Sequence, residues 1–200
     1  MVIFIHYQFE RLHKMRKIIL SNEQIQDICS LIGSQLATRY RFNDTPPIFI
    51  GVMKGAIPFL NDLVCHCDIP LFIDYIQIGS YNGTESTGTV ILKKDVSLDI
   101  RGKDIILVED IVDSGISMNF LVDYFTKKYS PKSIVTVALL DKKVNRKIPF
   151  ELDYFGIEVE NEFLMGYGLD YNDLWRNTRE VFVPTPEEVK EWDELLAAKK

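Results

Sequence analysis

Short, continuous apolar runs alternate along this chain with longer segments whose apolar residues recur at helical spacing. The runs at 48–53, 104–108 and 133–140 are rich in Val, Ile and Leu, which is typical of strands covered on both faces of a parallel sheet. The segments 21–40 and 57–64 carry apolar residues three and four positions apart, which predicts amphipathic helices. This alternation predicts an α/β fold with a central, mainly parallel twisted sheet and flanking helices.

The remaining segments complete this picture. Helices are expected at 119–129, which ends before Pro131, and at 186–196, which begins with a proline, carries early acids and has lysines near its end. We expect a small hood subdomain that includes short strands at 154–159 and 163–165. Further strands are predicted at 71–78, 89–92 and 181–183.

The segment Val108–Ser117 is the most informative part of the chain. It reads Val-Glu-Asp-Ile-Val-Asp-Ser-Gly-Ile-Ser and follows a strand of the buried type. Glu109 and Asp110 stand at the carboxyl end of that strand, where open α/β sheets bind their ligands. Carboxylates at this edge are suited to bind the hydroxyl groups of a ribose.

The loop that follows is suited to bind a phosphate. Gly115 permits a tight turn, and backbone N–H groups with the Ser114 and Ser117 hydroxyls can bind an anion at the start of the next helix. Ordinary turn chemistry is the alternative, in which Asp113 or Ser114 satisfies the first N–H groups of the helix. Three acids and a hydroxyl-bearing glycine loop directly after a buried strand favour the ribose phosphate site.

Length and charge restrict the class of protein. Two hundred residues with 46% hydrophobic content suffice for one domain with its own core. With 29 acids against 23 bases, the net charge is −6, and the chain has no long basic block, so a nucleic acid partner is not expected. The apolar start at 2–5 is interrupted too early for a membrane span, and we therefore expect a cytoplasmic protein without membrane attachment.

The cysteines agree with a reducing compartment. Cys29, Cys65 and Cys67 are odd in number and do not form a disulfide framework. The run Cys65-His66-Cys67 suggests zinc, but the sequence offers no second ligand pair at a suitable spacing, which favours a structural role for these residues.

Two stretches resemble one known family. The segment 108–117 closely resembles the diphosphosugar-binding motif of the type I phosphoribosyltransferases, in the form found in their hypoxanthine-guanine branch. The segment 163–177 resembles the C-terminal signature of the same branch, although Glu160-Asn161 stands where Pro-Asp is common. That departure bears on base orientation and guanine preference.

The resemblance covers about residues 16–184. Family members usually begin near Arg16, which makes Met15 a candidate start. We accordingly expect an N-terminal extension at 1–17, the phosphoribosyltransferase domain at 18–184 and a C-terminal helix at 185–200.

The resemblance implies a role for each matching residue. Glu109 and Asp110 would contact the ribose 2- and 3-hydroxyls and the magnesium shell, and Asp113 would accept or share the proton of purine N7. The 5-phosphate would be bound by Ser114, Gly115, Ile116 and Ser117; pyrophosphate by Lys54, Gly55 and Arg176; and the purine by Lys142, Phe163 and Leu164. Asp170 would join the magnesium shell through water, and Ser80 and Tyr81 would begin a closing loop.

Several of these matches are weak when taken singly. Lys54-Gly55 is a common turn sequence, Ser80-Tyr81 could begin an ordinary hairpin, and Lys142 opens a basic run of the kind found on surfaces. Phe163 could be core packing and Asp170 a cap. Their joint occurrence is what gives the site its support.

The resemblance implies transfer of a phosphoribosyl group from phosphoribosyl diphosphate to hypoxanthine or guanine, with Mg²⁺ as cofactor and a homodimer or homotetramer as the assembly. The alternative is a regulatory binding module that senses phosphoribosyl diphosphate on the same fold. A Rossmann dinucleotide enzyme is not favoured, because Gly-x-Gly-x-x-Gly is absent after every predicted strand.

Overall fold

The protein was analysed as a computed structural model that describes residues 16–80 and 90–198. The chain divides into two compact units, which we call the sheet unit (Glu23–Asn161) and the hood unit (Met1–Asn22 with Glu162–Lys200). Each is described by itself. None of the helices in the described ranges is long and apolar enough to cross a membrane.

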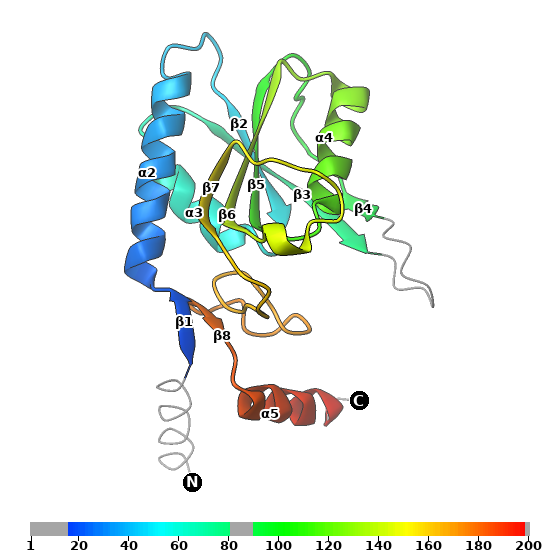
Figure 1. The fold of residues 1–200 in the computed structure, drawn as a ribbon. Coiled ribbons are helices and arrows are strands. Elements are labelled where there is room, and N and C mark those ends of the chain that lie inside the picture. Colours follow the sequence, from blue (N-terminus) through cyan, green and yellow to red (C-terminus); the bar gives the residue numbers. More distant parts are fainter. Residues whose placement is uncertain (1–15, 81–89, 199–200) are drawn as a thin grey trace. The chain divides into compact units, whose positions relative to one another are not determined.

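The sheet unit is built on one six-stranded sheet (Figure 1). Its strand order is β4-β3-β2-β5-β6-β7; all neighbours are parallel except β4, which runs antiparallel to β3 at one edge. The strands are β2 (Ile48–Met53), β3 (Phe72–Ser80), β4 (Val90–Lys94), β5 (Asp104–Val112), β6 (Ser133–Asp141) and β7 (Tyr154–Glu158). The predicted fold class is confirmed.

Helices cover both faces of this sheet. In Figure 1, α2 (Asn22–Tyr40) and α3 (Ile57–Cys65) lie on one side and α4 (Ile116–Tyr129) on the other. The helix α4 contributes Met118, Leu121 and Phe125 to a buried cluster with apolar residues of β2, β5 and β6. Because both faces are covered, these central strands can be apolar without alternation.

The hood unit has its own small core. The strands β1 (Lys17–Leu20) and β8 (Val181–Val183) pair antiparallel, and α5 (Pro186–Ala197) follows. Met165, Phe182 and Trp192 are buried together. A capping box between Thr185 and Glu188 begins α5, which stabilises the first turn of the helix.

The structure corrects three predictions from sequence. The strand predicted at 104–108 continues to Val112, so Glu109 and Asp110 lie within β5 and not after it. The strand near 154–159 belongs to the main sheet as β7, because it pairs with β6, and not to the hood. The segment 163–165 is not a strand; only Met165 forms an isolated bridge, with Phe182.

Asp95 anchors the segment after β4 to the end of α4. Its Oδ2 accepts hydrogen bonds from the hydroxyls of Tyr124 and Tyr129 and from Lys128 Nζ. Burial raises the pKa of the Asp95 carboxyl, but hydrogen bonds from Lys128, Tyr124 and Tyr129 outweigh burial and lower the pKa to about 2. The charged form of Asp95 therefore stabilises the fold.

Asp95→Asn tests this anchor. Since folding lowers the pKa, the stabilisation is complete above the ordinary value of 3.8 and is lost as the pH falls toward 2. We expect the free energy of unfolding in urea to fall by about 1 to 2 kcal/mol at neutral pH, and the difference from wild type to narrow below about pH 3. Asp123→Asn, which breaks an exposed pair with Lys127, should cost less than about 0.5 kcal/mol. If Asp95→Asn lowered the free energy of unfolding by the same amount at neutral pH and below about pH 3, the assignment would be contradicted.

Candidate active site at the carboxyl edge of the sheet

Two adjacent carboxylates near the end of β5 dominate this edge. Asp110 is buried, with 8% of its surface exposed, and its Oδ1 accepts a hydrogen bond from the Ile111 amide at 2.8 Å. Glu109 Oε2 is buried without a hydrogen-bond partner among the described residues. Burial raises the pKa of Glu109 well above its usual value, and the negative charge of Asp110 raises it further. Such a carboxyl favours a proton or an incoming cation.

The loop after β2 lies directly against the Asp110 carboxylate. A Cβ atom added to Gly55 would stand 2.0 Å from Asp110 Oδ2, so the backbone can approach the carboxylate only because residue 55 has no side chain. Lys54, beside it, follows the last residue of β2, and the Met53–Lys54 peptide bond is cis. The structure therefore brings the predicted pyrophosphate loop together with Asp110, one of the two predicted ribose carboxylates.

The loop between β5 and α4 has the geometry of an anion site. Gly115 adopts a left-handed conformation with φ 80°, and α4 begins at Ile116, three residues earlier than the sequence pattern predicted. The residue before α4 is Gly115, which has no side chain to cap the helix, and Ser114 Oγ accepts a long hydrogen bond of 3.4 Å from the Ile116 amide. Ser114 thus satisfies one N–H group of the first turn, as the turn-chemistry alternative expects, and the positive end of the helix remains suited to an anion. Asp113, which precedes the turn, is exposed.

Lys142 lies at the same edge. Val112 of β5 and Asp141 of β6 are register partners, and the Lys142 amide donates to the Val112 carbonyl at 2.9 Å. The Lys142 residue is buried, with 8% exposed. The parallel pairing of β5 and β6 brings Lys142 to the edge where Glu109 and Asp110 lie, and the alternative of an exposed surface lysine is wrong.

The remaining predicted residues belong to the hood unit. Phe163 is half exposed and packs edge-on against Tyr171, with ring centroids 6.0 Å apart, whereas Leu164 is buried. Arg176 Nη2 pairs with Asp170 Oδ1 at 2.7 Å, and its Nη1 donates to the Gly168 carbonyl at 2.6 Å. Within the hood unit, the predicted magnesium and pyrophosphate residues therefore bind each other.

The side chains of two predicted site residues lie outside what the structure describes. Ser80 is the last residue of β3, and Tyr81 lies outside the described residues, together with the rest of the predicted closing loop to residue 89.

Sequence reasoning missed one residue at this edge. Arg146 contacts the carbonyls of Val112 and Asp113 and pairs with Asp141. In the sequence it was only one member of a basic run, and its sole local signal was a position four residues after Lys142.

The carboxylate oxygens at this edge are suitable ligands for a magnesium ion that is also bound by water and substrate. No group of three or more His, Cys, Asp or Glu side chains with metal-site geometry occurs in the described ranges. Glu109 and Asp110 nevertheless offer hard oxygen donors, and Glu109 Oε2 is buried with no hydrogen-bond partner in the part of the chain that the structure describes. Mg²⁺ is commonly held by one or two carboxylates with water and substrate phosphates, and that is the arrangement these residues suit.

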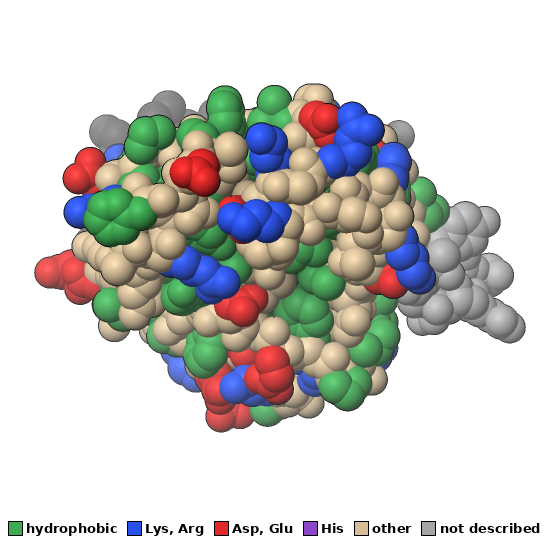
Figure 2. Space-filling model, turned by 90° about the horizontal axis from the view of Figure 1, so that it is seen from above, with side chains coloured by type: hydrophobic (Ala, Val, Ile, Leu, Met, Phe, Trp, Pro, Cys, Tyr) green, Lys and Arg blue, Asp and Glu red, His purple; other side chains and the backbone are tan. Residues whose placement is uncertain are grey.

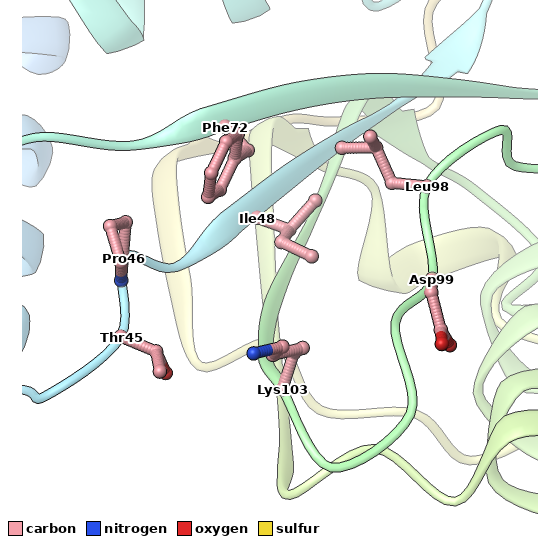
Figure 3. A pocket seen from close by; sticks show the side chains of 7 residues that line it. All are labelled: Thr45, Pro46, Ile48, Phe72, Leu98, Asp99 and Lys103. Atoms are coloured by element: carbon pink, nitrogen blue, oxygen red, sulfur yellow. The ribbon is translucent and has the colours of Figure 1, made fainter.

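A cavity of about 260 Å³ lies elsewhere in the sheet unit (Figure 3). Its lining precedes or begins β2, β3 and β5, so the cavity lies at the amino ends of these strands. Figure 2, viewed toward that end, shows acidic and basic side chains interspersed with apolar ones. No predicted site residue lines the cavity, whose walls are Thr45, Pro46, Ile48, Phe72, Leu98, Asp99 and Lys103.

Comparison with known proteins agrees with this geometry. The family model of the phosphoribosyl transferase domain matches residues 16–172. A hypoxanthine-guanine phosphoribosyltransferase of Bacillus subtilis is 41% identical over 175 residues, which cover 87% of this chain and 96% of that protein.

Solved structures give the same result. A hypoxanthine phosphoribosyltransferase from Staphylococcus aureus has a TM-score of 0.80 at 36% identity, covering 86% of this chain and 92% of that one. The Trypanosoma cruzi hypoxanthine phosphoribosyltransferase, solved in complex with the product IMP, has a TM-score of 0.78 at 33% identity and covers 86% and 95%.

The chain belongs to the phosphoribosyltransferase family. Within that family it groups with the hypoxanthine-guanine phosphoribosyltransferases, which are purine salvage enzymes. The resemblance noted in the sequence is confirmed, and the enzyme is favoured over the regulatory module, because these relatives are transferases.

Gly55→Ala tests the approach of the loop to the carboxylates. The added methyl group must displace the Asp110 carboxylate or the loop itself, so we expect kcat/KM to fall at least about tenfold. The crowding should also lower the free energy of unfolding by about 1 to 3 kcal/mol. Steady-state kinetics and urea unfolding measure the two effects.

Gly102→Ala is the matched control. Gly102 has φ 64° with open space around it, so alanine there should cost about 1 to 2 kcal/mol of stability and leave turnover unchanged. Wild-type kinetics in Gly55→Ala would show that the close approach is not needed.

Proposed function

We propose that this protein transfers the phosphoribosyl group from phosphoribosyl diphosphate to N9 of hypoxanthine or guanine, giving IMP or GMP and pyrophosphate. The observation that carries the proposal is that Gly55, Asp110, Lys142 and the start of α4 lie at one edge of the sheet. The relatives support it, since one is a hypoxanthine-guanine enzyme and another binds IMP as product.

The negative and positive groups of the edge have separate tasks. Glu109 and Asp110 bind the ribose 2- and 3-hydroxyls, whereas Lys54 and Gly55 bind pyrophosphate through an ammonium group and the backbone. The 5-phosphate is bound by the residues of the turn and the first helical residues, where N–H groups and the helix dipole favour an anion; these are Ser114, Gly115, Ile116 and Ser117.

We assign Mg²⁺ to the Glu109 and Asp110 carboxylates, because the raised pKa of Glu109 reflects a buried site that favours an incoming cation. When bound, the ion would neutralise the charge of the diphosphate leaving group. Asp170 contributes through water, and Arg176 binds pyrophosphate with its planar fork of donors. For both residues, the ligand has to compete with the Asp170–Arg176 ion pair.

Base recognition falls to three residues. The Lys142 ammonium donates to the exocyclic O6 of hypoxanthine or guanine, Phe163 stacks on the purine, and Leu164 offers backbone groups to its edge. Adenine carries an amine at that position, and two opposed donors left unsatisfied in a closed pocket cost on the order of 1 to 3 kcal/mol. Lys142 thereby rejects adenine. Ser80 and Tyr81 begin the loop that excludes water during the reaction.

We infer further that the protein works in the cytoplasm as a homodimer or homotetramer. A structure of the Trypanosoma cruzi enzyme concerns the role of its C-terminal region in oligomeric state and activity, which makes an oligomer the assembly to test for this relative. We retain 18–184 as the phosphoribosyltransferase domain, with 1–17 as an extension and 185–200 as a C-terminal helix.

The proposal predicts a pattern across a panel of bases. Protein, phosphoribosyl diphosphate and Mg²⁺ are mixed with hypoxanthine, guanine, xanthine or adenine, and pyrophosphate release is measured. We expect release with hypoxanthine and guanine, and at least about tenfold less with adenine. Binding of the diphosphosugar without release for any base would instead indicate the regulatory module.

Asp113→Asn tests the proton acceptor. Asp113 is exposed at the start of the loop between β5 and α4, residues 113–115, which we call the phosphate loop. It would take or share the N7 proton as the base becomes nucleophilic. General base catalysis typically supplies about 10² to 10⁴ in rate, so turnover should fall by about that factor while diphosphosugar binding persists. Asp99→Asn, which breaks an exposed pair with Arg101, is the control. Turnover within about tenfold of wild type would remove Asp113 from this role.

A further inference from the structure

The segment after Lys142 folds back behind the phosphate loop. Arg146 Nη1 donates to the Val112 carbonyl at 3.0 Å and to the Asp113 carbonyl at 2.9 Å, while its Nη2 bonds the Asp141 carboxylate. The Arg146 side chain is 11% exposed and that of Asp141 is fully buried. One guanidinium group thus joins the ends of two neighbouring strands.

The next two residues continue this contact. The backbone amides of Lys147 and Ile148 both donate to the Ser114 carbonyl, at 3.0 and 3.2 Å. Three successive carbonyls of the loop, at residues 112, 113 and 114, therefore face the single segment 146–148. The room for this contact depends on Gly115, because a Cβ there would stand 2.7 Å from the Ile148 carbonyl oxygen and 3.0 Å from Arg146 Cδ.

The direction of these carbonyls fixes the direction of the loop amides. In a planar trans peptide unit, the C=O of one residue and the N–H of the next point to opposite sides, and none of these three peptide bonds is cis. The N–H groups of Asp113, Ser114 and Gly115 therefore point away from the segment 146–148. Successive N–H groups turned to one side form an anion-binding concavity.

We propose that Arg146 is a positioning residue for the 5-phosphate, acting through the backbone of residues 112–115. It orients the loop amides through their carbonyls, while its own charge is paired with the buried Asp141 carboxylate. The proposal rests on the function proposed above and adds a residue that touches neither substrate. Since Val112 O also accepts the Lys142 amide, the same carbonyl links the phosphate loop to the base-selecting lysine.

Arginine is specifically suited to this task. Its planar group presents donors in a rigid fork, and here the fork serves two carbonyls and a carboxylate at once. A lysine could retain the ion pair with buried Asp141, but its single ammonium group cannot reproduce the same planar arrangement. Arg146→Lys therefore separates orientation of the loop from neutralisation of the buried charge.

The test is binding of ribose 5-phosphate, measured by calorimetry without base or turnover, in wild type, Arg146→Lys and Arg146→Met. We expect affinity to fall at least about tenfold in Arg146→Lys and further in Arg146→Met, since hydrogen bonds to a charged group are lost. The KM for phosphoribosyl diphosphate should rise in parallel, while the KM for hypoxanthine changes less than about threefold. Arg101→Met, at an exposed arginine paired with Asp99, controls for the loss of one positive charge.

The outcomes separate this inference from the proposed function. If ribose 5-phosphate binds and depends on Arg146 but no base gives pyrophosphate, the proposed function fails and the positioning role stands. Two results would overturn the positioning role. One is an affinity of Arg146→Lys for ribose 5-phosphate within about twofold of the wild-type affinity, and the other is no binding of ribose 5-phosphate to the wild type. Should Arg146→Met not fold, the lysine variant decides. Unfolding of the lysine variant as well would assign Arg146 to stability alone and overturn the proposal.

Discussion

The parallel register of β2, β5 and β6 is the constraint on which the site depends. Parallel neighbours end at the same edge of a sheet, so the residues that follow each strand are brought together although they lie far apart in the sequence. Here the edge collects Gly55 after β2, Asp110 near the end of β5 and Lys142 after β6. The continuous apolar character of the three strands, covered by helices on both faces, holds that register in place.

Close backbone approach then refines the edge. Gly55 lets the loop after β2 touch the Asp110 carboxylate, and Gly115 lets the turn after β5 lie against the segment 146–148. Both positions exclude a side chain for lack of space, and Gly115 also requires a left-handed conformation. The edge is thus shaped by main-chain contacts, and the charged side chains act from positions that these contacts define.

The charged side chains at this edge form two separate groups, one acidic and one basic. Two adjacent carboxylates with a raised Glu109 pKa lie near the end of β5, and the Arg146 guanidinium lies behind the phosphate loop. The carboxylates favour a cation, whereas Arg146, whose charge is paired with Asp141, turns the loop amides toward the side where an anion would bind. Within the hood unit, the Asp170–Arg176 pair keeps two further charged groups satisfied by each other, which limits the cost of holding them in place before a ligand arrives.

The sequence by itself determined the class of fold, the helices and most strands, and the segments that carry the chemistry, because these depend on local apolar periodicity and on short motifs. It did not determine which strand pairs with which. The segment 154–159 was assigned to the hood, but its strand β7 pairs with β6, and β5 extends past its apolar run to include Glu109 and Asp110.

Only the tertiary structure revealed Arg146 as part of the edge. A long side chain in a basic run carries no local signal of its direction, since its position depends on carbonyls supplied by another strand and its loop. Strand partners and the targets of long side chains are set by contacts between distant segments, which no local pattern encodes.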